Sequence, residues 1–279
     1  MDFKYFSKNG EVLPVAEAVI PLSNIEYQYG YGVYESVRLV NGIAYFLKDH
    51  LERLMHSARI IGLEHSFSPQ AIDSSISELV ETSGADTCNV KILLVGGRTA
   101  ADASLFILCL NPLFPDKRLY ASGATLITCE YERLYPHAKT LNMLGSFLAY
   151  QKAQAASAYD ALLVNGKGYL TEGTRTNFFC MTGRTIFTPR ESEILLGVAR
   201  KVVLKVAGET GFAVEEKDIS LTGLDHYDAA FITSTSSKIL PVRSIDGHTF
   251  DARAAPLREL MGTFDQFLAN YHTHQKDGG

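Results

Sequence analysis

The sequence predicts a two-domain protein of mixed α+β or α/β architecture. In roughly the first 100 residues, short apolar runs bounded by turn residues alternate with stretches in which apolar side chains recur at helical spacing. Two prolines and their polar neighbours interrupt this pattern at residues 111–116, and similar patterns resume beyond them. We therefore expect a smaller N-terminal α/β domain at residues 1–115, a linker at residues 116–121 and a larger C-terminal domain at residues 122–279.

The composition indicates an ordinary globular protein. The chain is 46% hydrophobic and 20% charged, and its net charge is -5. A sequence pI of about 5.9 and the absence of a basic cluster argue against nucleic acid as a partner. No apolar run approaches the length of a membrane span, and the first residues lack the basic-then-apolar order of a signal peptide. We expect a cytoplasmic protein with no membrane partner.

The cysteines indicate packing and no metal site. Cys88, Cys109, Cys129 and Cys180 are widely spaced, lie mostly in apolar strand-like surroundings, and form no paired ligand motif. We expect all of them to be reduced structural residues, because a free cysteine packs as a small hydrophobe.

Turn residues predict the strands of the N-terminal domain. Asn9-Gly10 and Asn41-Gly42 each separate two strand-like runs, which is typical of a β-hairpin. Gly96-Gly97 separates two further apolar runs that indicate buried strands. The expected strands cover residues 3–6, 12–15, 33–40, 43–47, 90–95 and 105–110.

Two helices are expected between these strands. Asp49 is a plausible N-cap of the first, with Glu52 at the capping-box position and apolar residues at helical spacing beyond it. The second is expected to begin at Ser68-Pro69 and to end at Ser83-Gly84, since proline favours the first helical position and glycine the position after the last.

The C-terminal domain shows the same kinds of pattern. We expect a hairpin across Asn165-Gly166 and a helix directly after Gly197. The expected strands cover residues 124–129, 161–164, 168–170, 178–181, 185–188 and 229–233, and the expected helices cover residues 144–156 and 198–207.

Two segments carry the groups that a pyridoxal phosphate enzyme requires. Lys139 lies in the run 137–142, and Glu172-Gly173 closes a predicted hairpin. Such an enzyme needs an amine to hold the cofactor aldehyde as a Schiff base, an acid beside the ring nitrogen and a phosphate anchor. A lysine can supply the amine if desolvation or a neighbouring cation makes it partly neutral near pH 7. A helix start and an arginine can anchor the phosphate.

Six motifs in a fixed order resemble the class IV aminotransferases, which are the fold-type IV pyridoxal phosphate enzymes. They are the runs 29–35, 50–54 with 57–58, 139–142, 171–173 with 177–178, 196–200, and 233–235 with 241–242 and 246–247. The family includes branched-chain aminotransferases, D-amino acid aminotransferases and 4-amino-4-deoxychorismate lyases. Each motif alone is weak evidence for this family, whereas six motifs in the family's order are strong evidence. The resemblance implies the two-domain fold-type IV architecture and a homodimer, which is also the commonest oligomer.

The resemblance assigns the main roles at the cofactor. Lys139 matches the Schiff-base lysine, which also moves the substrate α-proton as general acid and base. Glu172 matches the partner of the ring nitrogen, and Arg53 matches the phosphate-binding arginine.

Further phosphate contacts are implied at two places. The backbone amides of Val198 and Ala199 match a helix start that binds phosphate, and Ser234 and Thr235 match a second contact. The family commonly has threonine where this chain has Ala199, so one hydroxyl contact is missing while the amide contact survives.

Candidate substrate-binding residues lie in the N-terminal half. Tyr34, Ser36 and Arg38 alternate along one strand and therefore share a face, where the resemblance implies that they line the substrate pocket. Tyr29 matches the residue that branched-chain enzymes extend into the neighbouring subunit's site.

The residues expected to bind the substrate carboxylate differ from those usual in D-amino acid aminotransferases. Those enzymes have an arginine and a histidine after the strand near residue 95, whereas this chain has Arg98 and no nearby histidine. Lys91 and Arg98 are then the candidates for binding a substrate carboxylate. Arg175 replaces the small residue usual after Glu-Gly and adds positive charge near the cofactor rim.

The function expected from these motifs is transfer of an amino group between an amino acid and a 2-oxo acid such as 2-oxoglutarate or pyruvate. The spacing from Lys139 to Asn142 is closer to the D-amino acid and deoxychorismate branches, whereas the run 241–244 is closer to the branched-chain branch. We favour a D-amino acid enzyme with a non-standard carboxylate trap. A branched-chain L-amino acid aminotransferase, a 4-amino-4-deoxychorismate lyase and a catalytically silent binding protein remain alternatives.

Overall fold

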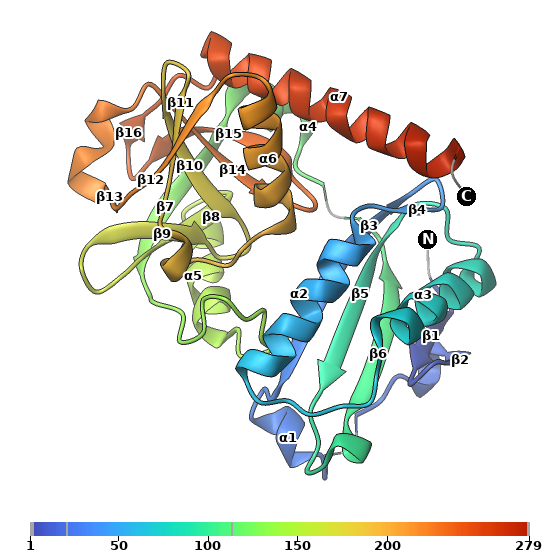
Figure 1. The fold of residues 1–279 in the computed structure, drawn as a ribbon. Helices are drawn as coiled ribbons and strands as arrows, with labels where there is room; N and C mark the ends of the chain where they lie inside the picture. Colours follow the sequence, from blue (N-terminus) through green and yellow to red (C-terminus); the bar gives the residue numbers. More distant parts are fainter. Residues whose placement is uncertain (1–2, 21, 113, 278–279) are drawn as a thin grey trace. The chain divides into compact units, whose positions relative to one another are not determined.

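The computed structural model describes residues 3–20, 22–112 and 114–277, and the chain divides into two compact units (Figure 1). The first unit comprises Met1–Leu113 and His137–Asn142, and the second comprises Phe114–Pro136 and Met143–Gly279. This division differs from the expected one because His137–Asn142, the segment with the candidate lysine, belongs to the first unit. Leu113, which the sequence places next to the expected boundary, lies outside the described residues.

The first unit is built on an antiparallel sheet. Its strand order is β2-β1-β6-β5-β3-β4, and each neighbouring pair runs antiparallel. The strands are β1 (Tyr5–Lys8), β2 (Glu11–Pro14), β3 (Gly32–Val40), β4 (Ile43–Ala44), β5 (Cys88–Val95) and β6 (Ser104–Leu110). The helices are α1 (Ile25–Gln28), α2 (Leu47–Ile60) and α3 (Pro69–Ser83), with 3-10 turns at Val15–Glu17 and Ala100–Asp102.

One face of this sheet forms the core of the first unit with α2 and α3, which lie across it in Figure 1. Val33 and Val37 of β3 pack there with Leu54 of α2 and Ile72 of α3. Because side chains alternate along a strand, the even-numbered residues of β3 face the opposite side of the sheet. The residues predicted to line the substrate pocket therefore lie on the face that α2 and α3 leave uncovered.

The α3 helix begins and ends as predicted. The Ser68 hydroxyl accepts a hydrogen bond from the Ala71 amide at 3.1 Å, and Pro69 occupies the first helical position. Gly84 caps the other end with a φ of 58°, a conformation that glycine adopts without strain.

The predicted start of α2 is wrong by three residues, since Asp49 was the expected N-cap. The helix begins at Leu47 with Phe46 as its N-cap, and the His50 amide donates to the Phe46 carbonyl at 3.1 Å. Asp49 therefore lies inside the first turn, where its negative charge is favourable for the helix dipole without acting as a cap.

The second unit contains a closed ring of strands. Its sheet has the order β12-β11-β10-β14-β15-β7-β8-β9-β13, with β16 beside β15 and an additional pairing of β9 with β10. That pairing, Glu172 opposite Asn177, joins the two ends of the series β10-β14-β15-β7-β8-β9. The candidate acid thus lies at the point where the ring closes.

The elements of the second unit include all of the strands and helices expected from the sequence. The strands are β7 (Ala124–Glu130), β8 (Asp160–Val164), β9 (Tyr169–Gly173), β10 (Asn177–Thr182), β11 (Thr185–Thr188), β12 (Ala213–Glu216), β13 (Ile219–Ser220), β14 (Ala229–Ser234), β15 (Lys238–Ile245) and β16 (His248–Thr249). The helices are α4 (Lys117–Ser122), α5 (Leu144–Ala155), α6 (Val198–Glu209) and α7 (Ala255–Asp277), with 3-10 turns at Glu191–Glu193 and Leu221–His226.

Two helices of the second unit were not expected. The segment predicted as a linker forms α4, whose N-cap Asp116 accepts a hydrogen bond from the Arg118 amide at 2.9 Å. The α7 helix buries Leu257, Leu260 and Phe264, which lie on one side of the helix by their spacing.

The structure confirms a mixed α+β fold. Among the described residues, none of the helices combines the length and the apolar character needed to cross a membrane.

Candidate active site

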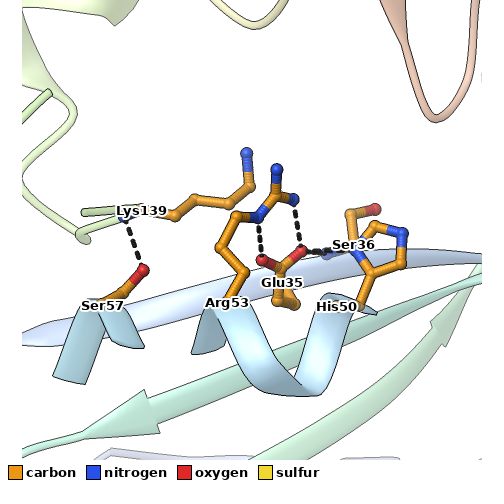
Figure 2. Close-up of polar contacts among 6 residues, drawn as sticks. All are labelled: Glu35, Ser36, His50, Arg53, Ser57 and Lys139. Carbon is orange, nitrogen blue, oxygen red and sulfur yellow. Dashed lines mark hydrogen bonds and ion pairs between the residues drawn. The ribbon is translucent and has the colours of Figure 1, made fainter. Parts of the chain in front are cut away.

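The backbone of Lys139 is fixed by two elements of the first unit. The Tyr34 amide of β3 donates to the Lys139 carbonyl at 2.9 Å, and the Leu141 amide donates to the Gly32 carbonyl at 2.8 Å. The Lys139 amide donates to the Ser57 hydroxyl of α2 at 3.0 Å, as Figure 2 shows. The segment around the lysine therefore runs alongside β3 as a short antiparallel extension of the sheet.

This approach requires glycine at position 32. A Cβ atom there would lie 2.6 Å from Leu141 Cδ1 and 2.8 Å from the Leu94 carbonyl oxygen, which is backbone and cannot turn aside. Any larger residue would disturb the pairing of β3 with β5 and would displace the Leu141 side chain of the lysine segment.

The amine of Lys139 lies over an aromatic ring together with a second amine. Lys139 Nζ is 4.6 Å from the centroid of the Tyr34 ring, and Lys91 Nζ is 3.6 Å from the same centroid. Tyr34 is buried, at 8% exposure. Burial lowers the pKa of Lys91, and the charge of Lys139 lowers it further, while Tyr34 and Glu35 act in the opposite direction. The structure thus places three of the predicted residues together.

Arg53 lies in a buried polar cluster that the sequence did not reveal. Its Nε donates to Glu35 Oε1 at 2.6 Å and its Nη2 donates to Glu35 Oε2 at 2.9 Å. His50 Nδ1 lies 2.8 Å from the same Oε2. In Figure 2 the guanidinium of Arg53 and the amine of Lys139 point to the same side, away from the α2 ribbon. Glu35 therefore fixes the direction of Arg53 through a two-point contact.

Glu35 remains ionised although it is fully buried. Burial by itself would raise the pKa of its carboxyl, but the positive charge of Arg53 and the contacts with His50 and Arg53 outweigh burial and lower the pKa well below its ordinary range. The exposed fractions are 0% for Glu35 and 1% for His50. The residue pair His50 and Arg53, three positions apart on one helix, was the available signal for this cluster.

The remaining predicted residues of the first unit lie at different places. Ser36 and Arg38 follow Tyr34 on the same face of β3 and are half-buried. Arg98 is exposed, and its Nε lies 3.7 Å from a carboxylate oxygen of Glu26. Tyr29 is 77% exposed, directly after α1.

Glu172 is held by two donors in the second unit. Arg133 Nη1 donates to Glu172 Oε1 at 2.9 Å, and the Leu195 amide donates to Glu172 Oε2 at 3.1 Å. Glu172 is 3% exposed, so the carboxylate is kept in one orientation within a largely dry environment. Sequence reasoning identified Glu172 and missed both of its partners, which lie far from it in the chain.

Leu195 also connects Glu172 to the start of α6. Its carbonyl accepts a hydrogen bond from Asn177 Nδ2 at 2.8 Å, while its amide binds Glu172. Gly197 follows as the N-cap of α6 and offers no side-chain acceptor to the first amides of the helix. A side chain at Gly197 would collide with Asn177 Oδ1, so the close approach requires glycine.

The α6 start fits an external anion. Val198 and Ala199 are the first two residues of this helix, where amides have no partner within the helix and the dipole favours negative charge. Thr233 Oγ1 is a buried hydroxyl with no hydrogen-bond partner among the described residues. The next residue, Ser234, is hydrogen-bonded to Ser237 through their hydroxyls at 2.7 Å, and Thr235 lies in the same turn. An uncapped helix start and an unsatisfied buried hydroxyl fit a phosphate group.

Arg175 lies against two tyrosines. Its guanidinium carbon is 4.3 Å from the centroid of the Tyr150 ring and 5.8 Å from that of Tyr159. Asp160 beneath this turn is fully buried, and its carboxylate accepts hydrogen bonds from the Thr174 and Thr176 hydroxyls at 2.5 and 3.0 Å. Burial raises the pKa of Asp160, and the threonines and Arg175 oppose that shift. Asp160 thus fixes the turn that follows Glu172.

Comparison with known proteins identifies the family. The family model described as Amino-transferase class IV matches residues 32–245. The D-alanine aminotransferase of Bacillus licheniformis is 33% identical over 265 residues, which cover 91% of this chain and 93% of that protein. A putative branched-chain-amino-acid aminotransferase of Methanocaldococcus jannaschii is 28% identical over 254 residues, covering 87% of this chain and 88% of that protein.

Solved structures agree with the fold. A branched-chain amino acid aminotransferase of T.th., solved with pyridoxamine 5'-phosphate, superimposes with a TM-score of 0.87 at 25% identity, covering 95% of this chain and 93% of that chain. The branched-chain aminotransferase of Thermoproteus uzoniensis with norvaline gives a TM-score of 0.85 at 26% identity, and the match covers 94% of this chain and 93% of that chain.

The chain belongs to the class IV aminotransferases, as its motifs predicted. It is a pyridoxal phosphate-dependent aminotransferase of the fold-type IV architecture.

Proposed function

We propose that this aminotransferase moves an amino group between an amino acid, with D-amino acids favoured, and a 2-oxo acid such as 2-oxoglutarate or pyruvate. The observation that carries the proposal is the position of Lys139, whose backbone is bound to β3 and α2 and whose amine lies over the Tyr34 ring. An amine fixed in a partly desolvated place beside another cation suits covalent amine chemistry.

The residues around the cofactor have separate tasks. Pyridoxal phosphate, when bound, supplies an aldehyde for amines and a ring that withdraws electrons from the substrate α-carbon. Lys139 would hold the aldehyde, and its Nζ would accept and return the substrate α-proton as general base and acid. Glu172, oriented by Arg133 and Leu195, keeps the ring nitrogen protonated.

The phosphate is bound mainly by backbone groups. We assign it to the amides of Val198 and Ala199, with Ser234 and Thr235 as further contacts. Arg53 adds positive charge, and Glu35 keeps its guanidinium in one direction. The amide contacts explain how Ala199 can replace a hydroxyl-bearing residue.

The substrate carboxylate is assigned to the uncovered face of the first sheet. Lys91 on β5 lies directly opposite Ser36 on β3, and Arg38 lies two residues further along β3 on the same face. Tyr34 forms an apolar wall next to Lys91. Arg98 and Arg175 are exposed positive charges, and we assign them to the rim, where they attract anionic substrates.

The preference for D-amino acids is supported by sequence similarity. The D-alanine aminotransferase of Bacillus licheniformis is 33% identical to this chain, compared with 28% for the putative branched-chain enzyme of Methanocaldococcus jannaschii. The structural similarity to branched-chain enzymes supports a branched-chain L-amino acid aminotransferase as the second candidate.

An assay with paired substrates separates the two candidates. The purified protein is incubated with 2-oxoglutarate as the acceptor and either D-alanine or L-leucine as the donor, and the glutamate formed is quantified. The proposal predicts turnover of D-alanine with a rate at least about tenfold above that of L-leucine, which corresponds to about 1.4 kcal/mol of discrimination. Turnover of L-leucine alone would replace the D-amino acid assignment with the branched-chain one.

We also propose that the enzyme is a homodimer. Large apolar side chains are exposed in residues 19–29, where Leu22 is 93% and Tyr29 is 77% exposed, and on α5, where Leu144 is 67% and Phe147 is 53% exposed. Apolar surface of this kind is typical of a subunit interface. In such a dimer, Tyr29 reaches the site of the partner.

A further inference from the structure

Lys91 and Lys139 share one aromatic ring although they come from distant parts of the chain. Lys91 lies on β5 and Lys139 on the segment beside β3, and each Nζ is within 5 Å of the Tyr34 ring centroid, at 3.6 and 4.6 Å. Cation–π attraction holds each amine at the ring while the two positive charges repel one another. The two positive charges are therefore near enough to influence one another, and the charge of Lys139 is one of the causes that lower the pKa of Lys91.

The surroundings strengthen this repulsion. Lys91 and Lys139 are both half-buried and lie at a ring that is 8% exposed, so water screens the two charges less than it does at the surface. Near Lys139 lie the Tyr34 ring and Lys91, and Figure 2 also shows Arg53 of α2 and Glu35 of β3 in its neighbourhood, while Ser57 of α2 binds the Lys139 backbone amide. The charge of Glu35 is compensated because Arg53 and His50 both bind its carboxylate. The lowered pKa of Lys91, to which Lys139 contributes, agrees with this geometry.

We propose that Lys91 is a positioning residue for the reacting amine: its charge, held on the Tyr34 ring, makes Lys139 release its proton more readily and so present a neutral, nucleophilic amine near neutral pH. A neighbouring cation is one of the established means of activating a lysine. The inference rests on the proposed function, in which Lys139 is the reacting amine. It adds to the carboxylate-binding role of Lys91 a second role that operates before substrate arrives.

The test is the pH dependence of Lys139 labelling in the full-length protein stripped of cofactor. Trace acetic anhydride is added from about pH 6 to about pH 11, which spans the usual lysine range, and acetylation of Lys139 is quantified by peptide mass spectrometry. The variants are Lys91→Met and Lys91→Gln, which remove the charge, and Lys91→Arg, which keeps it. Lys48→Met, at an exposed position of α2, is the matched control.

Removing the charge is expected to move the midpoint of Lys139 labelling up by about one pH unit, which lowers the labelling rate near pH 8 about tenfold. Lys91→Arg and Lys48→Met are expected to stay within about twofold of the wild-type rate. Circular dichroism identifies any variant that fails to fold, and the neutral variant that folds decides the result. An unchanged midpoint in a folded neutral variant would overturn the inference.

The labelling result is independent of turnover. No cofactor or amino acid is present, so a protein that transaminates another substrate, or none, gives the same titration. Failure of the inference would leave the proposed transaminase function standing, and failure of the substrate assay would leave the labelling result unchanged.

Discussion

The Glu172 carboxylate illustrates how single side chains are positioned in this enzyme. Arg133 binds one of its oxygens and the Leu195 amide binds the other. Because Leu195 lies two residues before the α6 N-cap Gly197, the same residue connects the carboxylate to the proposed phosphate site. The orientation of Glu172 therefore depends on groups from two other parts of the second unit.

Arg133→Gln is expected to weaken cofactor binding. The variant removes a charge-assisted hydrogen bond, typically worth about 1.5–3 kcal/mol, from a carboxylate that is 3% exposed. Loss of orientation at Glu172 should raise the dissociation constant for pyridoxal phosphate about tenfold or more. Titration of the stripped protein with cofactor, followed by absorbance, measures this constant.

Arg190→Gln is the matched control for this prediction. Arg190 also forms an ion pair, with Asp218 at 2.8 Å, but its side chain is 55% exposed and that of Asp218 is 38% exposed. Exposed ion pairs of this kind contribute little to protein stability. Equal cofactor affinity in Arg133→Gln and the control would mean that Arg133 has no role in orienting Glu172.

Sequence motifs predicted the individual residues better than their partners. Lys139 and Glu172 stand in runs that can be recognised by themselves, so the resemblance identified both. Arg133 could not be found in this way because it lies 39 residues from Glu172 and the contact between them exists only in the folded second unit. Ser57 accepts a hydrogen bond from the Lys139 amide and lies 82 residues from it in the sequence. Local sequence patterns could not predict this contact for the same reason.

Between elements, the cluster of Glu35, His50 and Arg53 joins β3 to α2. Glu35 projects from β3 toward the helix, and both of its partners come from one face of α2. The ion pair between Arg53 and Glu35 is nearly dry, with 11% and 0% of the side chains exposed. The cluster therefore links the strand that carries Tyr34 to the helix that carries Ser57.

Glu35→Gln is expected to destabilise the first unit strongly. The variant leaves the guanidinium of Arg53 without its ionised partner inside the protein, which typically costs about 3–5 kcal/mol. Urea unfolding followed by circular dichroism measures the loss. Asp116→Asn, which removes the acid of an exposed pair with Arg118, should leave the midpoint almost unchanged. A Glu35→Gln midpoint equal to that of the wild type would contradict a structural role for the cluster.

The same cluster predicts a pH dependence. The pKa of Glu35 is lower in the folded protein than its ordinary value of 4.5, so the ionised form stabilises the fold above about pH 4.5. As the pH falls toward the lower folded value, this contribution disappears. The difference in unfolding free energy between the wild type and Glu35→Gln should therefore be constant near neutral pH and shrink in acid. A difference that grows as the pH falls would contradict this assignment.

The sequence predicted elements where local chemistry decides them. Asn9-Gly10 and Asn41-Gly42 each connect paired strands, because both residues of each step adopt the positive φ that such turns require. The α2 start was missed because Phe46 takes a left-handed conformation, with a φ of 54°, that no sequence rule assigns to phenylalanine. The α7 helix was missed although Leu257, Leu260 and Phe264 have helical spacing.

For the whole chain, the return of His137–Asn142 to the first unit was the main feature that the sequence did not predict. Patterns along the chain placed these residues in the C-terminal domain, since they follow the expected linker and the expected strand at residues 124–129. Three hydrogen bonds instead attach the segment to β3 and α2. Contacts between segments this far apart in the sequence depend on the tertiary fold, so local sequence patterns do not predict them.

The proposed dimer predicts a change in molecular mass. Phe147→Asp places a charge on the exposed apolar side of α5 and should shift the protein from dimer to monomer at micromolar concentration, because burying an unpaired charge is unfavourable. Size-exclusion chromatography with light scattering measures the mass. Gln70→Asp, at an exposed position of α3, is the control. A wild-type protein that is already monomeric would contradict the proposed dimer.

The attachment of the cofactor to Lys139 is the central claim, and one measurement tests it directly. The purified protein is reduced with borohydride, digested and mapped by mass spectrometry for a pyridoxyl label. The structure, with the Lys139 backbone held by β3 and α2 and its amine at the Tyr34 ring, leads us to expect the label on Lys139, and its loss in Lys139→Ala. A label on another lysine such as Lys91, or no label at all in protein that has bound the cofactor, would contradict it.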